Sequence, residues 1–172
     1  GTVNDSELRR HLTELLEGGN AHIGLNDAVK GFPVSKAGIR PAGAPRSAWE
    51  LLEHIRISAG DIIRFSGVTE KGPRPEGSRE PPRDYVELNW PDDYWPKSPA
   101  PGSAAEWKHS VAAIEKGVAE FIRFIQDPRN DLFKPFPWGT GQTLLREALL
   151  IADHGAYHLG QLRLVRQMVE EI

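Results

Sequence analysis

The chain has 172 residues, of which 39% are hydrophobic and 26% are charged, and its formal net charge is −3 at pH 7. A chain of this length can form one sizeable core, so we expect a single domain over residues 2–172, with Gly1 interpreted as a remnant of tag removal. The weak negative charge and the scattering of basic residues among acidic ones argue against nucleic-acid binding. No apolar run approaches the roughly 20 residues of a membrane span, so no membrane partner is expected.

The chain contains no cysteine. Disulfides, thiolate metal ligands and a cysteine nucleophile are therefore excluded. Residues 1–5 have neither the basic nor the apolar region of a signal peptide. Because nothing indicates an oxidising compartment, we expect a cytoplasmic location.

The first predicted helix begins at Asn4 or Asp5, since either side chain can cap a helix. Apolar residues then recur at helical spacing, at Leu8, Leu12, Leu15, Leu16 and Ile23. Gly18 and Gly19 could end this helix because glycine is costly in a helix interior, but the apolar stripe stays in phase beyond them. We predict one long helix that reaches about Lys30.

Residues 31–45 carry three prolines and three glycines, which predicts an irregular crossover. The second predicted helix begins at Ser47, because Ser47 and Glu50 have the spacing of a capping box. Its buried stripe comprises Leu51, Ile55, Ser58, Ile62 and Phe65. The helix should end near Gly67.

The segment of residues 69–102 holds eight prolines, which exclude regular structure. It also contains several aromatic residues, too many for a free tail: Tyr85, Trp90, Tyr94 and Trp95. We predict a long loop that packs over one end of the helices.

The third predicted helix begins at Ser103, which repeats the capping-box spacing with Glu106, and ends at Asp127 before a proline. A fourth helix is predicted from about Gln142 to the C-terminus, after a connection rich in proline, glycine and aromatic residues. No strand-like alternation competes with these helices. The pattern predicts an all-α four-helix bundle with long crossover loops.

Three histidines are the candidate metal ligands. His154 and His158 are four residues apart in the fourth predicted helix, so their rings share one face within reach of a single ion. His54 borders the apolar stripe of the second helix, so three imidazoles can converge from two helices. Three neutral nitrogens leave coordination positions free, which is the pattern of catalytic rather than closed structural sites. The alternative that these are buried histidines without a metal stays open.

Gly155 follows the first of these histidines, where zinc metalloproteases have a glutamate, so peptidase chemistry of that type is not expected. His22 could face the same cavity or be a buried histidine bonded to a loop carbonyl. Asp61 lies roughly 10 Å beyond His54 along the helix, so a loop cap or an indirect contact is favoured over ligation. Gln161 could orient a bound water or simply contact solvent.

Four aromatic residues could line an apolar pocket or cover the bundle end: Trp90, Tyr94, Trp95 and Trp138. His11 and His109 have no partner in the pattern.

Two segments carry a resemblance to a known family. These are Trp-Glu-Leu-Leu-Glu-His-Ile at residues 49–55 and Asp-His-Gly-Ala-Tyr-His-Leu-Gly-Gln-Leu at residues 153–162. Together with the helix order and loop placement, they resemble the DinB-like (YfiT-type) family of bacterial four-helix bundles. The resemblance implies that His54, His154 and His158 bind a divalent transition metal, above all nickel or zinc, and that the chain forms a homodimer.

The resemblance also points to two kinds of activity on a small-molecule substrate. Some relatives are thiol-dependent transferases or isomerases that use a small bacterial thiol, which for this cysteine-free chain must be exogenous. Others are metal-dependent hydrolases. The alternative is a non-catalytic, metal-stabilised or ligand-binding bundle with a stress-related role. No carboxylate is convincingly placed as a general acid or base, so no catalytic residue is assigned.

Overall fold

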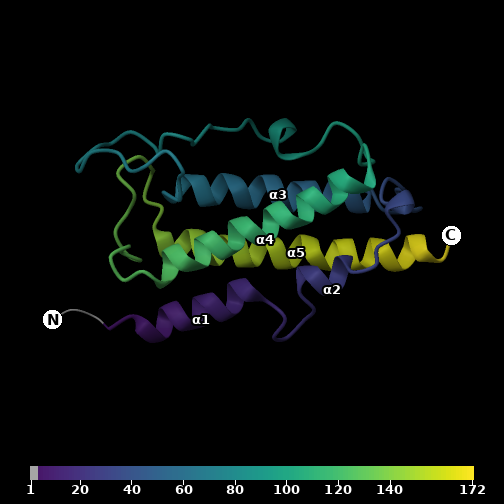
Figure 1. The fold of residues 1–172 in the computed structure, drawn as a ribbon, viewed down its shortest axis with the longest axis horizontal. Helices are drawn as coiled ribbons and strands as arrows, with labels where there is room; N and C mark the ends of the chain where they lie inside the picture. Colours follow the sequence, from purple (N-terminus) through teal and green to yellow (C-terminus); the bar gives the residue numbers. More distant parts are fainter. Residues whose placement is uncertain (1–3) are drawn as a thin grey trace.

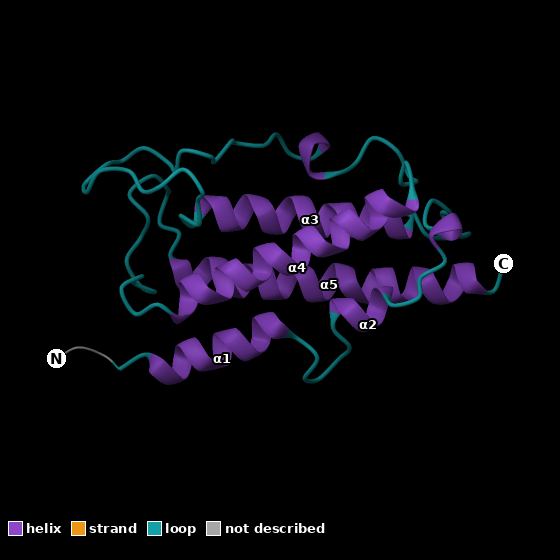
Figure 2. Cartoon of the chain, in the orientation of Figure 1, coloured by secondary structure: helices purple, strands orange, loops and turns teal. Residues whose placement is uncertain are grey.

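The computed structural model describes residues 4–172, so Gly1 and the first two residues of the expected domain, Thr2 and Val3, lie outside the described part. Within residues 4–172 every regular element is a helix (Figure 2). The principal helices are α1 (Ser6–Glu17), α3 (Ala48–Phe65), α4 (Ala104–Gln126) and α5 (Leu144–Glu170). A short helix, α2 (Leu25–Val29), follows α1 along the same side of the bundle (Figure 1). The predicted all-α bundle is confirmed.

The helices pack so that α3 contacts both α4 and α5, and α1 contacts the same two helices on the other side (Figure 1). One core cluster includes Trp49, Leu52 and Leu162, which are almost fully buried. A second cluster, nearer α1, includes Phe121 and Ile125. Since α3 and α5 run in opposite directions, the first half of α3 lies beside the second half of α5 (Figure 1).

The first helix is shorter than the sequence predicts. α1 ends at Glu17 and α2 begins only at Leu25, so the prediction of one helix to about Lys30 is wrong. Gly18 and Gly19 have φ angles of 75° and 77°, which a right-handed helix does not allow. The two glycines end the helix although the apolar residues beyond them stay in phase with its apolar stripe. Their turn leaves a gap between α1 and α2 on this side of the bundle.

The connection from α3 to α4 runs along the length of α3 (Figure 1). The prediction that it packs over one end of the bundle holds only for its first part, since residues 69–82 share a pocket with residues 129–138 at that end. It contains one 3₁₀ turn, η2 (Asp92–Tyr94), which contacts α3. Tyr94 and Trp95 attach this part of the loop to α3 through a hydrogen bond and a ring stack. The loop consequently covers the face of α3 that carries His54. The crossover before α3 has one further 3₁₀ turn, η1 (Val34–Lys36).

Ser47 caps α3 as predicted. Its hydroxyl oxygen accepts a hydrogen bond from the Glu50 amide at 3.2 Å, and the Glu50 carboxylate accepts one from the Ser47 amide at 3.0 Å. The Glu50 side chain is only 1% exposed, and Arg40 and Arg46 both donate to it. Burial alone would raise the pKa of Glu50, but the hydrogen bonds from Arg40, the Ser47 amide and Arg46 lower it to about 2.

The caps of the next two helices are simpler. Ser103 accepts from the Glu106 amide at 3.1 Å, but the Glu106 carboxylate accepts from the Gly102 amide instead of completing the predicted box. α5 begins one residue after Thr143, whose hydroxyl accepts from the Arg146 amide. Local side-chain hydrogen bonds thus fix the start of each helix that carries or faces a candidate ligand.

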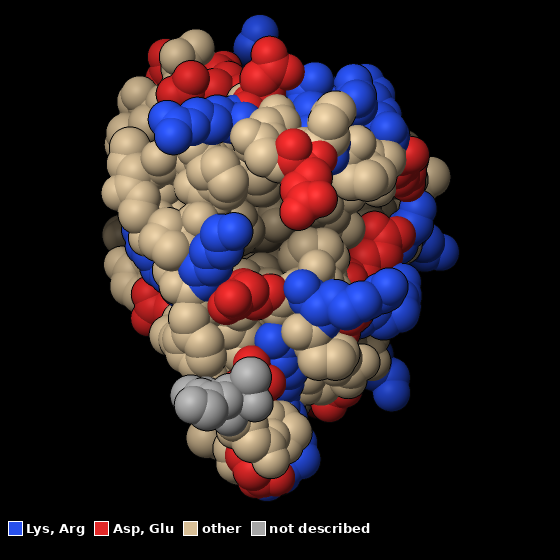
Figure 3. Space-filling view, turned by 90° about the vertical axis from the view of Figure 1, so that its left-hand side faces the viewer, with Lys and Arg blue, Asp and Glu red and all other residues tan. Residues whose placement is uncertain are grey.

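Among residues 4–172, no helix combines the length and the apolar character that crossing a bilayer requires. Figure 3 shows the face at the end of the bundle where α3 ends and α5 begins. Basic and acidic side chains are interspersed on that face. It therefore presents no broad patch of one charge.

We expect Glu50→Gln to lower the free energy of unfolding by about 1–3 kcal/mol at pH 7, because a neutral amide cannot satisfy two guanidinium groups in a buried position. The pKa of Glu50 is lowered on folding, so its stabilisation is complete above the ordinary value of 4.5 and is lost as the pH falls towards 2. Urea unfolding of the native chain and the variant at pH 7 and pH 3 measures both effects.

Glu106→Gln is the matched control, since Glu106 is exposed and its carboxylate accepts a hydrogen bond from the backbone amide of Gly102. A difference between native chain and Glu50→Gln that is the same at pH 7 and pH 3 would contradict the assigned ion pair.

Candidate metal centre

Three histidine side chains meet between α3 and α5. His54 comes from the second turn of α3, and His154 and His158 come from successive turns of α5. Each offers one ring nitrogen, and these nitrogens all lie within 4.8 Å of one another. The structure therefore brings together all three residues that the sequence singled out. We call them the histidine group.

Two of these rings have their orientation fixed by hydrogen bonds. His54 Nδ1 donates to the carbonyl oxygen of Tyr94 at 2.7 Å, and His158 Nδ1 donates to Gln161 Oε1 at 2.8 Å. In a neutral imidazole with its proton on Nδ1, the Nε2 atom keeps a lone pair. Outer partners of this kind orient the histidines of metal sites and set their tautomer.

The closest contact in the histidine group joins His54 Nε2 and His154 Nε2, which are 3.1 Å apart. Because His54 Nε2 carries a lone pair, the contact requires either a proton on His154 Nε2 or a shared cation. A separation of 3.1 Å is close to that of two nitrogens that each lie about 2.0–2.1 Å from one ion. Imidazole ligands without thiolate or carboxylate suit zinc, nickel, copper or iron. The group is thus compatible with one divalent transition-metal ion.

The surroundings keep the three rings neutral. Burial, followed by the neighbouring His158 and His54 rings, lowers the pKa of His154 to about 4. Burial also lowers the pKa values of His54 and His158. Metal binding needs deprotonated ligands, so the site can accept a cation at neutral pH without first losing protons.

Trp95 covers the His54 ring. The two ring centroids are 3.8 Å apart and the planes differ by 1°. The Arg46 guanidinium lies over the Trp95 ring at 4.0 Å, and Arg46 also pairs with Glu50 of the capping box. His54 is 1% exposed, whereas His154 and His158 are only partly buried. Solvent and small molecules therefore reach the group from the α5 side.

Asp61 contacts the site indirectly, in line with the sequence prediction. Its Oδ2 accepts a hydrogen bond from the Tyr94 hydroxyl at 2.8 Å, and the Tyr94 carbonyl oxygen accepts from His54. Its other oxygen, Oδ1, is buried and has no hydrogen-bond partner among the described residues. Burial raises the pKa of Asp61 although the Tyr94 hydrogen bond opposes this change. Asp61 thus helps to hold the loop that orients His54.

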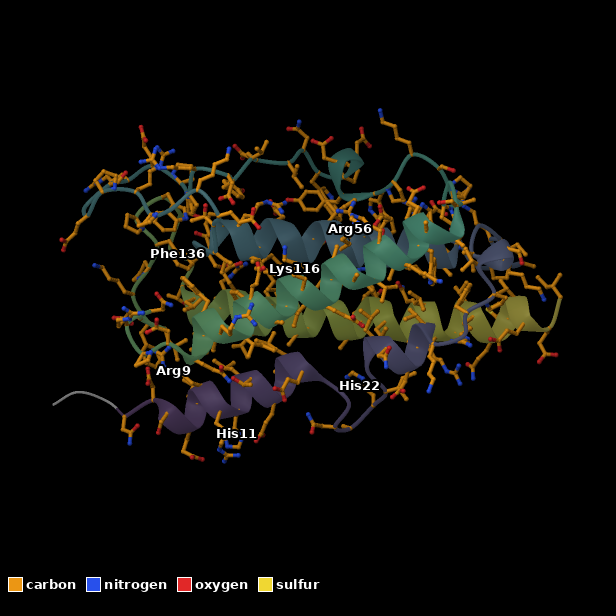
Figure 4. The ribbon with its side chains drawn as sticks, viewed as in Figure 1. Arg9, His11, His22, Arg56, Lys116 and Phe136 are labelled. Carbon is orange, nitrogen blue, oxygen red and sulfur yellow. The ribbon has the colours of Figure 1, made fainter. Side chains whose placement is uncertain are left out.

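The other candidate residues take different places. Gln161 is exposed, in line with the predicted solvent contact, and its Oε1 also accepts a hydrogen bond from His158 Nδ1. His22 lies in the segment between α1 and α2, is exposed, and its Nδ1 contacts the Ile23 carbonyl oxygen at 2.7 Å (Figure 4). The prediction of a buried, carbonyl-bonded histidine is therefore wrong in its burial. His22 is not part of the histidine group.

The predicted aromatic set divides between two places. Trp95 stacks on His54, and Trp90 is 69% exposed with its ring centroid 6.3 Å from that of His54. Trp138 donates to the Phe65 carbonyl oxygen at the end of α3. His11 lies on the outer face of α1 beside Glu7 and Glu14 (Figure 4). His109 is exposed on α4.

Sequence reasoning missed two parts of the site. The spacing of three residues between His158 and Gln161 places their side chains side by side on a helix and could have indicated their hydrogen bond. The Tyr94 carbonyl has no sequence signal, because its position depends on the path of the loop.

The DinB superfamily matches residues 24–162, a span that includes all three histidines. The chain belongs to the DinB superfamily. No curated protein and no solved structure matched the chain. The family expected from residues 49–55 and 153–162 is therefore confirmed, and the activity has to be argued from the site of this DinB-superfamily protein itself.

We expect the purified DinB-superfamily chain to hold about one nickel or zinc ion, and His54→Ala, His154→Ala and His158→Ala each to weaken its binding by more than about 100-fold. Losing a ligand should exceed the roughly 10–100-fold effect of losing an outer partner. Elemental mass spectrometry gives the metal content, and calorimetric titration gives the affinity.

His11→Ala and His109→Ala are matched controls, since both histidines are exposed and lie outside the histidine group. Equal metal content in all five variants would contradict the three-histidine site.

We also expect Gln161→Leu to weaken metal binding by about 10–100-fold, because the His158 ring loses the acceptor that orients it. Gln167→Leu makes the same change at an exposed position of α5 and should leave the affinity unchanged. If the two variants bind metal equally well in calorimetric titrations, the hydrogen bond to His158 has no role in metal binding.

Proposed function

We propose that this protein is a metal-dependent enzyme in which His54, His154 and His158 hold one divalent ion, nickel or zinc, and a small exogenous thiol is transferred to a small-molecule substrate. The convergence of the three ring nitrogens, two of them on rings with a fixed Nδ1–H donor, carries the proposal. A bound ion would lower the pKa of a coordinated thiol or water and polarise the substrate.

The protein groups around the histidines favour a thiol over water as the attacking group. No carboxylate belongs to the histidine group, and Asp61, which is linked to it through Tyr94, already accepts the tyrosine hydroxyl. A thiol has an ordinary pKa of about 8.5, whereas that of water is about 15.7, so a thiol needs far less help from a general base. Because the chain has no cysteine, the thiol must come from solution.

The other residues of the site would have distinct roles in the reaction. Tyr94 and Trp95 hold the His54 ring in one orientation and keep water away from its face. The partly buried His154 and His158 leave an open side on which a thiol and a substrate can approach. Gln161 keeps the proton of His158 on Nδ1, so that Nε2 faces the other two histidines.

A fluorescence assay of thiol transfer tests the proposal. N-acetylcysteine and monochlorobimane are mixed with protein of known metal content, and fluorescence reports thioether formation. In this reaction a C–S bond forms and a C–Cl bond breaks, and chloride and the thiol proton are released to solvent. We expect the nickel or zinc form to exceed the metal-free form and His154→Ala by at least about tenfold, a typical minimum for loss of transition-state stabilisation. His109→Ala should match the native chain.

Hydrolysis of p-nitrophenyl acetate is measured in parallel, because metal-dependent hydrolysis is the other activity of this class. If protein with one ion per chain accelerates neither reaction, the proposal of an enzyme fails. A non-catalytic, metal-stabilised bundle with a ligand-binding or stress-related role would then be the better account.

The expected homodimer and cytoplasmic location stay predictions. Exposed apolar side chains on one side of α5 support a dimer, since Leu149, Tyr157 and Leu164 follow one another at seven- or eight-residue spacing and are 47%, 65% and 58% exposed.

A further inference from the structure

A cavity of about 500 Å³ that is partly open to solvent lies next to the histidine group. Helices α3, α4 and α5 line it, together with the end of α1, the segment that follows and the start of α2. Most of its wall is apolar, with Ile55, Ile62, Ile114, Val118, Ile151 and Leu159 as its main inner residues. Apolar cavities of roughly 300–1,000 Å³ with a few polar groups are typical of small-molecule sites.

The cavity shares one residue with the histidine group. His154 lines its wall and also lies 3.1 Å from His54 through their Nε2 atoms. His54 and His158 do not line it. A molecule in the cavity would therefore contact the candidate metal centre through His154, from a direction different from the exposed side of α5.

The segment between α1 and α2 forms part of the cavity wall, through Gly18, Gly19, His22 and Gly24. His22 lies in this segment (Figure 4), and Leu15, which also lines the cavity, is 51% exposed. On the α5 wall, a Cβ atom added to Gly155 would have no neighbour within 4 Å. The space is thus not filled by the protein's own side chains.

The charges around the cavity are of one sign. Glu17, Asp27 and Glu115 line it, whereas no lysine or arginine does. None of these three carboxylates forms an ion pair with a residue that the structure describes. An anion would be repelled there, and a cation would be attracted.

We propose that this cavity binds the apolar body of the molecule on which the metal centre acts, and that this molecule is uncharged or cationic in its apolar part rather than anionic. The inference rests on the proposed function, and it adds the substrate class. Binding places the molecule against His154 and leaves the thiol to approach from the exposed side of α5.

Three probes of equal length test the cavity: hexanol, hexylamine and hexanoate. They are titrated into methyl-labelled protein, metal-stripped and zinc-loaded, and followed by NMR. Saturable shifts are expected at the methyl groups of Ile55, Val118 and Ile151. Hexylamine should bind at least about fivefold more tightly than hexanoate at low salt, and the difference should shrink in about 0.5 M salt.

Two variants fill the cavity from opposite walls, Gly155→Leu on α5 and Val118→Phe on α4. Both should weaken hexanol binding by at least about tenfold, since the added atoms occupy its space. Gly160→Leu is the matched control, because an added Cβ there is also in open space but Gly160 does not line the cavity. Gly155 is next to His154 in the chain, whereas Val118 lies on another helix. Weaker binding in both variants would therefore come from the lost space and not from a disturbance of His154.

The outcomes separate this inference from the proposed function. Absence of saturable shifts, or hexanoate binding as tightly as hexylamine, overturns the cavity inference even if metal binding and thiol transfer are found. Cobalt is paramagnetic, so the protons of hexylamine bound near the metal centre should relax faster in cobalt-loaded protein than in the zinc form. Equal relaxation in the two forms would show that hexylamine does not bind near the metal centre. If the probes bind but the native chain binds no metal, the proposed function is wrong. The assignment of the cavity to the substrate is then wrong as well.

Discussion

His54 is almost completely buried between α3 and α5, and both of its ring nitrogens need partners there. One nitrogen finds the carbonyl oxygen of Tyr94, and the other faces His154. The first partner requires the long loop to lie along α3, and the second requires α5 to pack with its histidines towards α3. A single buried imidazole therefore couples the path of an irregular segment to the register of two helices.

The loop is held to this position by contacts that continue into the start of α3. Trp95 lies flat on His54, Arg46 lies over Trp95, and Arg46 pairs with Glu50, which closes the capping box of the helix. From the other side, the Tyr94 hydroxyl bonds to Asp61, two turns further along α3. A segment with eight prolines and a single 3₁₀ turn thus gains a defined place along α3.

The sequence predicts best what local chemistry decides. The start of α3 follows from Ser47 and Glu50, because a capping box needs only residues three apart. The pairing of His154 with His158 follows in the same way from helical spacing, and the apolar stripe beside His54 indicates its inward position. These features identified the fold class and the three histidines of the histidine group. That the three histidines bind a metal is a proposal.

The errors arise where backbone conformation or long-range packing decides. Apolar periodicity predicted that α1 would continue past Gly18, but periodicity records side-chain phase and not the φ angle that a glycine adopts. Prolines predicted an irregular loop without indicating its path, so the Tyr94 carbonyl could not be foreseen. The contact of Arg40 with Glu50 could not be foreseen either, since only the fold brings Arg40 to it, whereas Arg46 lies four residues before Glu50.

The break in α1 has an energetic consequence that connects the fold to the site. Leu15, at the end of α1, lines the cavity and is 51% exposed. Full burial of such a side chain is worth roughly 1.5–3 kcal/mol, so the open arrangement forgoes a measurable part of that stabilisation. Protein interiors are otherwise close-packed, and an unfilled apolar space beside a buried polar cluster is uncommon. The two glycines therefore end α1 beside a cavity that His154 also lines, and an apolar molecule bound there would cover the apolar surface that the early end of α1 leaves open.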